Sequence, residues 1–175
     1  GRPGFDTPSG KFEIHASGLE EYGYPPLPVY TEPLEGPRSQ PERAHRFPLI
    51  FNSGARVRTS FHTQHHGVPG LVRQRPEPTV TIHPKDAEAR DIQTGDAVRI
   101  TSPRGEIILR ARVTGDIASG SIEANHACGS PVGPESWSSK NINALTDLEN
   151  YDPISGFPVY KCLLCQVEKA GGTGK

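Results

Sequence analysis

Several features that mark particular classes of protein are missing from this chain of 175 residues. It contains no methionine, even at position 1, so we expect a processed chain, an isolated domain or a fragment. Three cysteines are too few for a disulfide framework. No run of 18 apolar residues is present, which predicts no membrane-spanning helix, and the N-terminus lacks the apolar core of a signal peptide.

Hydrophobic residues are also scarce, at 33% of the chain, whereas glycine (19) and proline (18) are abundant. This composition excludes a long-helix bundle or a coiled coil and predicts many turns and loops. The length suits one domain with a single core.

Acidic residues are absent from residues 43–76, although the whole chain has a net charge of only -1. That segment carries six arginines and four histidines: Arg43, Arg46, Arg56, Arg58, Arg73, Arg75, His45, His62, His65 and His66. The pattern favours a surface that binds an anion. The alternative is a chance fluctuation with solvated arginine side chains.

The first 46 residues are rich in proline and predict an extended arm. Proline removes hydrogen-bond donors and disfavours helix in the residue before it. Residues 10–14 have the alternation of a short strand. We expect the arm to pack on a partner surface, and a disordered leader is the open alternative.

From Phe47 onwards the pattern is that of a mainly β, barrel-like domain with long loops. A short helix is predicted over residues 85–90, after Pro84. Strands are predicted over residues 47–51, 79–82, 97–102, 106–113, 121–124 and 159–167.

The two longest loops, 52–77 and 125–158, are candidates for ligand binding. The first contains residues 54–66, which combine a glycine, two arginines, hydroxyl groups and a glutamine. Arginine binds phosphate oxygens through two parallel hydrogen bonds, so this segment predicts a phosphorylated ligand. Neither a Walker loop nor a GxGxxG motif is present.

Two other groups of residues have competing interpretations. His62, His65 and His66 could bind zinc, but no matching carboxylate lies nearby in the sequence, and hydrogen-bonding histidines are favoured. Cys162 and Cys165 have the CxxC spacing, and we interpret them as buried cysteines of a strand rather than a zinc or redox site.

Five motifs together resemble, in order, the C-terminal part of the molybdopterin oxidoreductases of the dimethyl sulfoxide reductase and formate dehydrogenase superfamily. The resemblance covers about residues 5–167. Its motifs are FDTPSGKFEI (5–14), RTSFH (58–62), HPKDAEARDIQTGDAVRITSPRGEI (83–107), NALT (143–146) and DPISGFPVYK (152–161).

The resemblance implies a six-stranded double-psi β-barrel over residues 47–169, preceded by the arm (1–46) and followed by a flexible tail (170–175). It implies a capping domain that binds the phosphates and pterin of molybdopterin guanine dinucleotide, in the bis form with molybdenum or tungsten. The cofactor-binding residues it implies, with Arg56 from the anion-binding segment, are Arg56, Arg58, Thr59, Ser60, His62, Thr63, Gln64, His126, Asn143, Tyr160 and Lys161.

The residue that ligates the metal in this superfamily, and any iron-sulfur motif, lie in domains that precede this one. We therefore expect no catalytic or metal-ligating residue here and an inactive isolated chain. The expected partners are the remaining domains or a catalytic subunit, with no nucleic acid and no membrane contact. The expected location is the cytoplasm, or the periplasm if the full enzyme is exported, and the substrate stays open.

Two other functions compete with this interpretation. One is a non-catalytic double-psi barrel module that binds another anionic ligand or partner. The other is a small zinc hydrolase that uses the histidine cluster. Neither explains why the five motifs occur in register.

Overall fold

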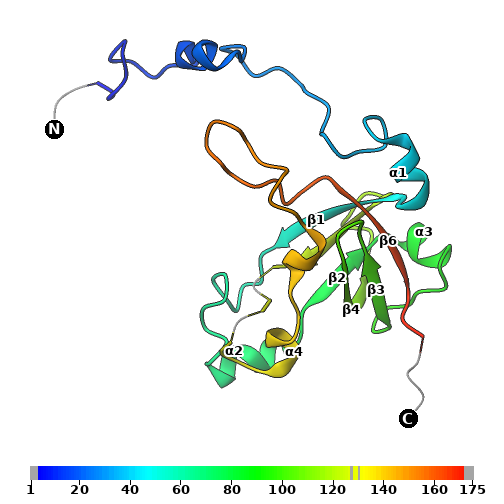
Figure 1. The fold of residues 1–175 in the computed structure, drawn as a ribbon. Helices are drawn as coiled ribbons and strands as arrows, with labels where there is room; N and C mark the ends of the chain where they lie inside the picture. The colour runs from blue at the N-terminus through cyan, green and yellow to red at the C-terminus, as the bar shows by residue number, and fades with distance from the viewer. Residues whose placement is uncertain (1–3, 127, 130, 172–175) are drawn as a thin grey trace. The chain divides into compact units, whose positions relative to one another are not determined.

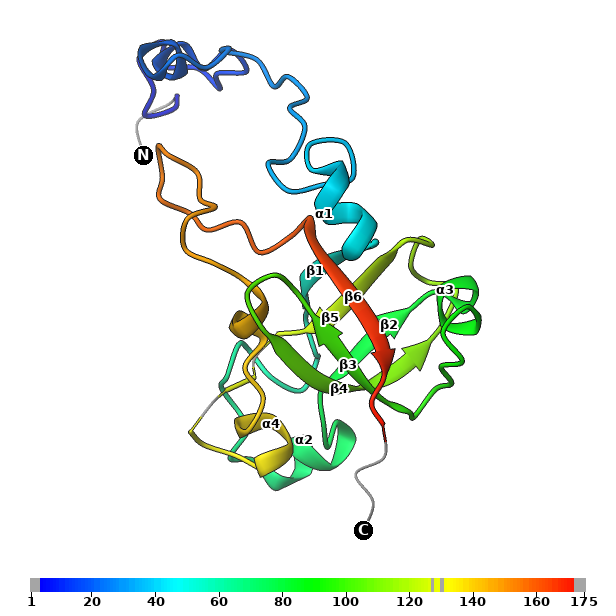
Figure 2. The same cartoon turned by 45° about the vertical axis from the view of Figure 1, so that its right-hand side comes forward.

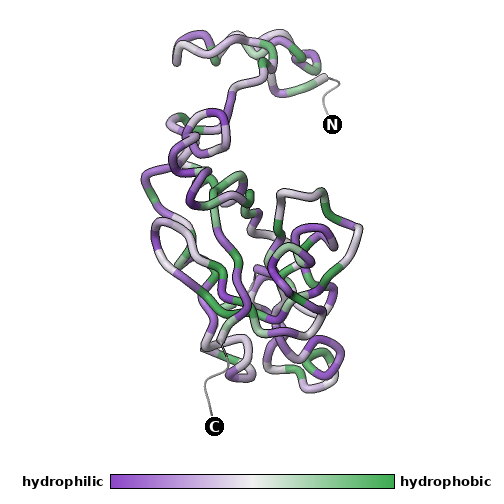
Figure 3. The backbone as a smooth tube through the Cα atoms, turned by 90° about the vertical axis from the view of Figure 1, so that its right-hand side faces the viewer, coloured by the Kyte–Doolittle hydropathy of each residue, from purple (hydrophilic) through white to green (hydrophobic). Residues whose placement is uncertain are grey.

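The computed structural model describes residues 4–126, 128–129 and 131–171. The chain divides into two compact units, Gly1–Glu32 and Pro33–Lys175. Among the described residues, no helix combines the length and the apolar character needed to cross a bilayer. Hydrophobic and hydrophilic residues instead alternate over short stretches of the backbone (Figure 3).

The first unit contains one short 3-10 helix, η1 (Ser17–Tyr22), and no strand among its described residues. The strand predicted over residues 10–14 is wrong. The backbone N–H of Phe5 donates to the Gly10 carbonyl, and Ser9 donates to the Glu13 carboxylate, so local turns occupy this stretch. An extended segment needs a neighbouring strand for its hydrogen bonds, and none pairs with it in the described part.

The second unit contains a closed barrel of six strands in the order β1-β5-β2-β4-β3-β6 (Figures 1 and 2). The pairs β1–β5 and β2–β4 are parallel and the other four pairs are antiparallel. The prediction of a six-stranded β-barrel is confirmed. The strands are β1 (Leu49–Ala55), β2 (Thr79–Ile82), β3 (Ala97–Thr101), β4 (Glu106–Val113), β5 (Ser121–Asn125) and β6 (Leu163–Lys169).

Alternation of side chains along the strands builds the core, as the β3–β4 hairpin shows. Val98 lies opposite Leu109 and Ile100 opposite Ile107, and both apolar pairs of this face point into the barrel. Arg110 and Arg112 of β4 point to the solvent face. Because side chains alternate with a period of two, one face of each strand can supply the whole core. The fully buried core residues include Phe51, Val80, Ile82, Val98, Ile100, Ile122, Ala124, Leu145, Leu163 and Val167.

The helices of this unit are all short, and three of them begin at a proline. Proline suits the first turn because its missing N–H would have no partner inside the helix. The helix predicted over 85–90 forms one residue earlier, as α3, where His83 Nδ1 accepts from the Lys85 N–H. The full set is α1 (Pro41–Arg46), α2 (Pro69–Gln74), α3 (Pro84–Glu88), α4 (Glu135–Ser138) and the 3-10 helix η2 (Ile142–Leu145).

The last strand begins later than the sequence predicts, at Leu163 instead of residue 159. Cys162 has a φ of 58°, which is incompatible with a continuous strand. The Cys162 N–H donates to Asn52 Oδ1 instead of to a ladder carbonyl. The segment before β6 is therefore an irregular connection whose side chains are free to face a ligand.

Residues 33–46, which the sequence assigned to the arm, fall within the second unit. Glu35, only 4% exposed, attaches them to the barrel. Its carboxylate accepts two hydrogen bonds from Arg104, at 2.7 and 3.0 Å, and one from the Leu164 N–H. Burial by itself would raise the pKa of Glu35, but these hydrogen bonds and the guanidinium charges of Arg104 and Arg43 outweigh it and lower the pKa.

At the other end of the chain, the Ala170 N–H donates to the Ala97 carbonyl. The remainder of the predicted tail, residues 172–175, lies outside the described residues.

Removal of the buried Glu35 carboxylate should destabilise the second unit. We expect Glu35→Ala to lower the free energy of unfolding by about 3 kcal/mol, because it leaves Arg104 with one acidic partner, Asp147. Urea unfolding would measure the loss, with Glu42→Ala on the exposed side of α1 as the control. Equal stability of the two variants would contradict the anchoring role of Glu35.

The core side chain of Ile100 is fully buried, and its truncation should leave a cavity. We expect Ile100→Ala to cost about 2–5 kcal/mol of stability by thermal or urea unfolding. Ile108→Ala, on the opposite face of the same hairpin, should cost clearly less because Ile108 is only half-buried. A similar cost for both variants would mean that this strand face does not form the core.

Candidate functional site

A cavity of about 410 Å³ lies where three loops of the second unit meet. Strands β1 and β5 are parallel neighbours, and Ala55 at the end of β1 pairs with Asn125 at the end of β5. The loops that follow the two strands therefore start at the same edge of the barrel. The cavity is lined by Ser53, Gly54, Arg56, His62, Thr63, His126, Cys128, Ile142, Asn143, Phe157, Tyr160 and Lys161.

The charge of this lining suits an anion. Arg56 and Lys161 are cationic, His62 and His126 are imidazoles, and no Asp or Glu is among the twelve lining residues. Arg56 and Lys161 are exposed, so both can meet a ligand from solvent. Within the described residues neither has an ion pair with an acidic side chain, which leaves their charge for a ligand.

The end of β1 positions the Lys161 side chain. The Ser53 N–H donates to the Tyr160 carbonyl at 3.1 Å, which attaches the last cavity segment to β1. The strand register shifts between Ser53 and Ala55, and Gly54 has a φ of 134°. A Cβ atom on Gly54 would lie 3.7 Å from Cε of Lys161. That separation is an ordinary van der Waals contact, so it is the positive φ of the irregular backbone that favours glycine here.

His126 is a half-buried imidazole whose pKa is lowered by its surroundings. Burial lowers its pKa, as do the neighbouring His62 and Arg56, while a hydrogen bond with the Gly54 backbone opposes them. The rings of His62 and His126 lie 5.4 Å apart. Nδ1 of His126 is buried and has no hydrogen-bond partner among the described residues. Unpartnered buried polar atoms beside a cavity fit a site that is completed by a polar ligand.

The helix η2 presents Asn143 to the cavity from a rigid base. Ile142 and Leu145 are buried, and Asn141 Oδ1 caps the helix by accepting from the Asn143 N–H. The Leu145 carbonyl accepts from both Ser102 Oγ and Arg104 Nε of the β3–β4 turn. The Asn143 side chain is exposed, and its amide can both donate and accept.

The structure brings together seven of the eleven predicted site residues: Arg56, His62, Thr63, His126, Asn143, Tyr160 and Lys161. Four others of the same loop, Arg58, Thr59, Ser60 and Gln64, do not line the cavity. In that loop the Gln64 N–H donates to the Phe61 carbonyl, and His62 has a φ of 53°, so a tight turn directs successive side chains apart.

Five residues that line the cavity were not among the predicted site residues: Ser53, Gly54, Cys128, Ile142 and Phe157. Phe157 lies within one of the five motifs and so had a signal, whereas the predicted strand over residues 47–51 ends before Ser53. Cys128 had none. Burial raises the pKa of its thiol to about 12, and Sγ donates to the Asn125 carbonyl. Cys128 therefore contributes an uncharged side chain to the cavity wall.

The cysteine pair differs from its predicted arrangement. Cys165 is fully buried in β6, as expected, but Cys162 is exposed and precedes the strand. The expectation of two buried strand cysteines is wrong for Cys162, because β6 begins after it. All three cysteines are free thiols. Within the described ranges, no three side chains of the His, Cys, Asp and Glu types gather in a group that could hold a metal ion.

His66 connects the two long loops and is not part of an exposed histidine cluster. Its ring is 6% exposed and packs on Trp137, with the ring centroids 4.9 Å apart. Trp137 Nε1 donates to the Arg75 carbonyl, which adds a second link between the loops. A Cβ atom on Gly133 would come within 2.6 Å of His66 Cβ, so the backbones pack closely.

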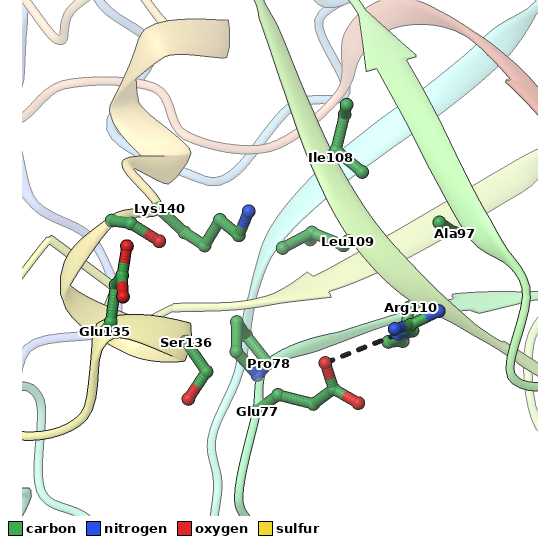
Figure 4. Close-up of a pocket in the computed structure, with 10 residues that line it drawn as sticks. Glu77, Pro78, Ala97, Ile108, Leu109, Arg110, Glu135, Ser136 and Lys140 are labelled. Carbon is green, nitrogen blue, oxygen red and sulfur yellow. Dashed lines mark ion pairs between the residues drawn. The ribbon is translucent and has the colours of Figure 1, made fainter. Parts of the chain in front are cut away.

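A second cavity, of about 290 Å³, lies between β4 and α4 (Figure 4). Glu77 and Glu135 contribute carboxylates to it, and Arg110 Nε is paired with Glu77 at 3.4 Å. Of its cationic groups, only Lys140 has no ion pair to an acidic side chain in the described part of the chain. Phosphate groups would face two carboxylates here, whereas the lining of the first cavity contains none.

A closed six-stranded barrel with a cationic cavity at the ends of the parallel strands β1 and β5 is suited to binding an anionic ligand. Residues 49–164 match the family model of the molydopterin dinucleotide binding domain. The chain belongs to this family, and the fit of the cavity to an anion with polar edges agrees with it.

The chain resembles much longer proteins of the same superfamily. It is 34% identical to acetylene hydratase of Syntrophotalea acetylenica over 91% of this chain and 24% of that protein. It is 34% identical to the putative dimethyl sulfoxide reductase chain YnfE of Escherichia coli over 93% of this chain and 21% of that protein. The solved structure of acetylene hydratase from Pelobacter acetylenicus superposes with a TM-score of 0.79 at 31% identity, covering 96% of this chain and 24% of the other.

The burial of His66 generates a pH prediction. Burial lowers the pKa of its imidazole, so the unfolded chain takes up this proton at a higher pH than the folded chain. Stability is therefore complete above about pH 6.5 and falls as the pH drops below it. Urea midpoints at pH 7.5 and pH 5.5 would measure the loss, which His66→Leu should reduce.

The exposed neighbour provides a matched variant, His65→Leu, for comparison with the substitution of the buried ring. His126 contributes in the same direction, so His66→Leu should reduce the slope without abolishing it. An identical slope in the wild-type chain and in His66→Leu would contradict the prediction.

Proposed function

We propose that this chain is the capping domain for a bis-molybdopterin guanine dinucleotide cofactor, with molybdenum or tungsten, in a larger oxidoreductase. The observation that carries the proposal is the cavity lining, which has two cationic side chains, two imidazoles and no carboxylate. A dinucleotide carries a pyrophosphate, and cationic side chains bind such groups through charge-assisted hydrogen bonds. Membership of the family and the length of the relatives support the proposal.

The residues divide by chemistry into two groups. Arg56 and Lys161 supply positive charge for phosphate oxygens, and Thr63 supplies a hydroxyl donor. His126 and Asn143 offer groups that can donate or accept at the edge of a heterocycle. Arg58, Thr59, Ser60 and Gln64 would join the site from the same loop. When bound, the cofactor supplies the redox chemistry of the metal centre, and the chain supplies binding and orientation.

The chain spans about a quarter of the length of the acetylene hydratase that it matches. We propose that the remaining domains, or a separate catalytic subunit, supply the metal-ligating residue and any iron-sulfur cluster. Residues 1–46 would pack on those parts, and the isolated chain would be inactive. We place the assembled enzyme in the cytoplasm or, if exported, in the periplasm.

Native mass spectrometry with elemental analysis, on the chain isolated from its source, would test the proposal. We expect a larger assembly or polypeptide that contains pterin dinucleotide and molybdenum or tungsten. The metal detected would also decide between the two elements. An assembly that contains this chain but neither pterin nor metal would overturn the proposal.

A charge deletion in the cavity should weaken cofactor retention without unfolding the barrel. We expect Lys161→Ala to cost about 1.5–3 kcal/mol, the loss of one charge-assisted hydrogen bond, or roughly tenfold to a hundredfold in affinity. Calorimetric titration of the wild-type and variant chains with guanosine diphosphate would measure this loss of affinity. Lys85→Ala, at the exposed start of α3, is the matched control.

Arg58→Ala tests whether the loop rearranges around the ligand, since Arg58 is exposed outside the cavity lining. A loss comparable to that of Lys161→Ala would mean that the loop rearranges around the ligand. Unchanged affinity in both Lys161→Ala and Arg58→Ala would show that the site lies elsewhere.

A further inference from the structure

The segment of residues 147–160, between η2 and β6, is an ordered hairpin and not a loose loop. The Asp152 N–H donates to the Phe157 carbonyl and the Val159 N–H to the Asn150 carbonyl, each at 2.8 Å. Asp152 Oδ1 accepts from both the N–H and the hydroxyl of Ser155, which fixes the tip. We refer to residues 147–160 as the hairpin.

Both ends of the hairpin are attached to the barrel. At its start, Asp147 Oδ2 pairs with Arg104 at 3.1 Å, and Asp147 Oδ1 accepts from the Asn150 N–H. At its end, the Tyr160 carbonyl accepts from the Ser53 N–H of β1. The hairpin extends away from the strands as an orange loop in Figures 1 and 2. The backbone of the hairpin is thus held in place although most of its side chains face solvent.

Those solvent-facing side chains are unusually apolar. The exposed fractions are 83% for Leu148, 50% for Tyr151, 38% for Ile154 and 68% for Phe157. None of them belongs to the core of the barrel. An ordered segment that presents clustered aromatic and aliphatic side chains to water is typical of a protein–protein interface.

The hairpin is also continuous with the cofactor cavity. Phe157 and Tyr160 line the cavity, and their rings pack edge to face with centroids 6.2 Å apart. Phe157 therefore belongs to both the cavity wall and the exposed apolar surface. Whatever covers the hairpin would also cover one side of the cavity.

The charge of the hairpin indicates the chemistry of its partner. Residues 141–160 contain no Lys, Arg or His, and the acids are Asp147, Glu149 and Asp152. Asp147 and Asp152 are engaged within the unit by the contacts described above, which leaves Glu149 at the rim. A complementary surface would have an apolar centre with a basic edge.

We propose that the hairpin docks on the remaining domains of the oxidoreductase and that this docking closes the cofactor cavity at Phe157. This inference rests on the proposed function, because the partner is the rest of that enzyme. The relatives are more than four times longer than the part that this chain matches, so a large body of protein is available to cover the hairpin. The family match over residues 49–164 includes the whole hairpin.

Hydroxyl-radical footprinting of the isolated chain and of the assembled enzyme tests the docking directly. We expect oxidation of Leu148, Tyr151 and Phe157 to fall at least tenfold in the assembly. Val68, an apolar residue that is 45% exposed on the loop before α2, serves as the internal reference. Equal oxidation of the hairpin in both samples would overturn the proposal. Protection that appears in the isolated chain as its concentration rises would identify a second copy as the occupant and overturn it too.

Variants give an independent readout of the same contact. With the chain and the remaining domains prepared separately, Leu148→Ser with Ile154→Ser should weaken their association at least tenfold. Val68→Ser should leave the association unchanged, and all the variants should keep the thermal midpoint of the wild-type chain because these side chains are exposed. Unaltered association of the Leu148→Ser/Ile154→Ser chain would contradict docking through the hairpin.

Guanosine diphosphate binding by the same variants separates this inference from the proposed function. If the nucleotide binds but the hairpin stays accessible in the assembly, the docking inference fails alone. If the hairpin is protected but neither the nucleotide nor the cofactor binds, the proposed function fails instead.

Discussion

The buried Glu35–Arg104 pair is the interaction on which the arrangement of the second unit depends. Arg104 also donates to the Leu145 carbonyl and pairs with Asp147, while Glu35 accepts from the Leu164 N–H of β6. One guanidinium thus ties the β3–β4 turn to the residues before β1, to the helix that presents Asn143 and to the start of the hairpin. Such a group is costly to bury, and it is stable here because it is paired on several sides.

The barrel separates its charges, and that separation makes one of its two cavities better suited to an anionic ligand than the other. The parallel pairing of β1 with β5 places the acid-free loop beside the loop that starts at His126. The cavity formed there lacks carboxylates, whereas the cavity between β4 and α4 contains Glu77 and Glu135. The fold could hold a ligand in either cavity. The charge of the lining residues, and not the shape of the cavity, therefore distinguishes the two.

Much of the fold could be predicted from the sequence, but the ligand-facing connections could not. The strands β2 and β4 have the predicted bounds because alternation of apolar and polar residues is local information. The start of β6 was predicted too early, since the positive φ of Cys162 and its bond to Asn52 depend on a strand 110 residues away. The His66–Trp137 contact could not be predicted from the sequence either, because it joins two loops that are far apart in the chain.

The sequence by itself determined the mainly β class, the acid-free segment and the family. Composition, alternation and the order of motifs can all be read along the chain without knowledge of its tertiary contacts. Only the tertiary structure decided which members of that segment meet in one cavity. Arg56 and Lys161 are far apart in the chain and become neighbours through the pairing of β1 with the connection before β6. It also decided that Phe157 faces both cavity and solvent. Long-range pairing brings such residues together, and no local pattern encodes the result.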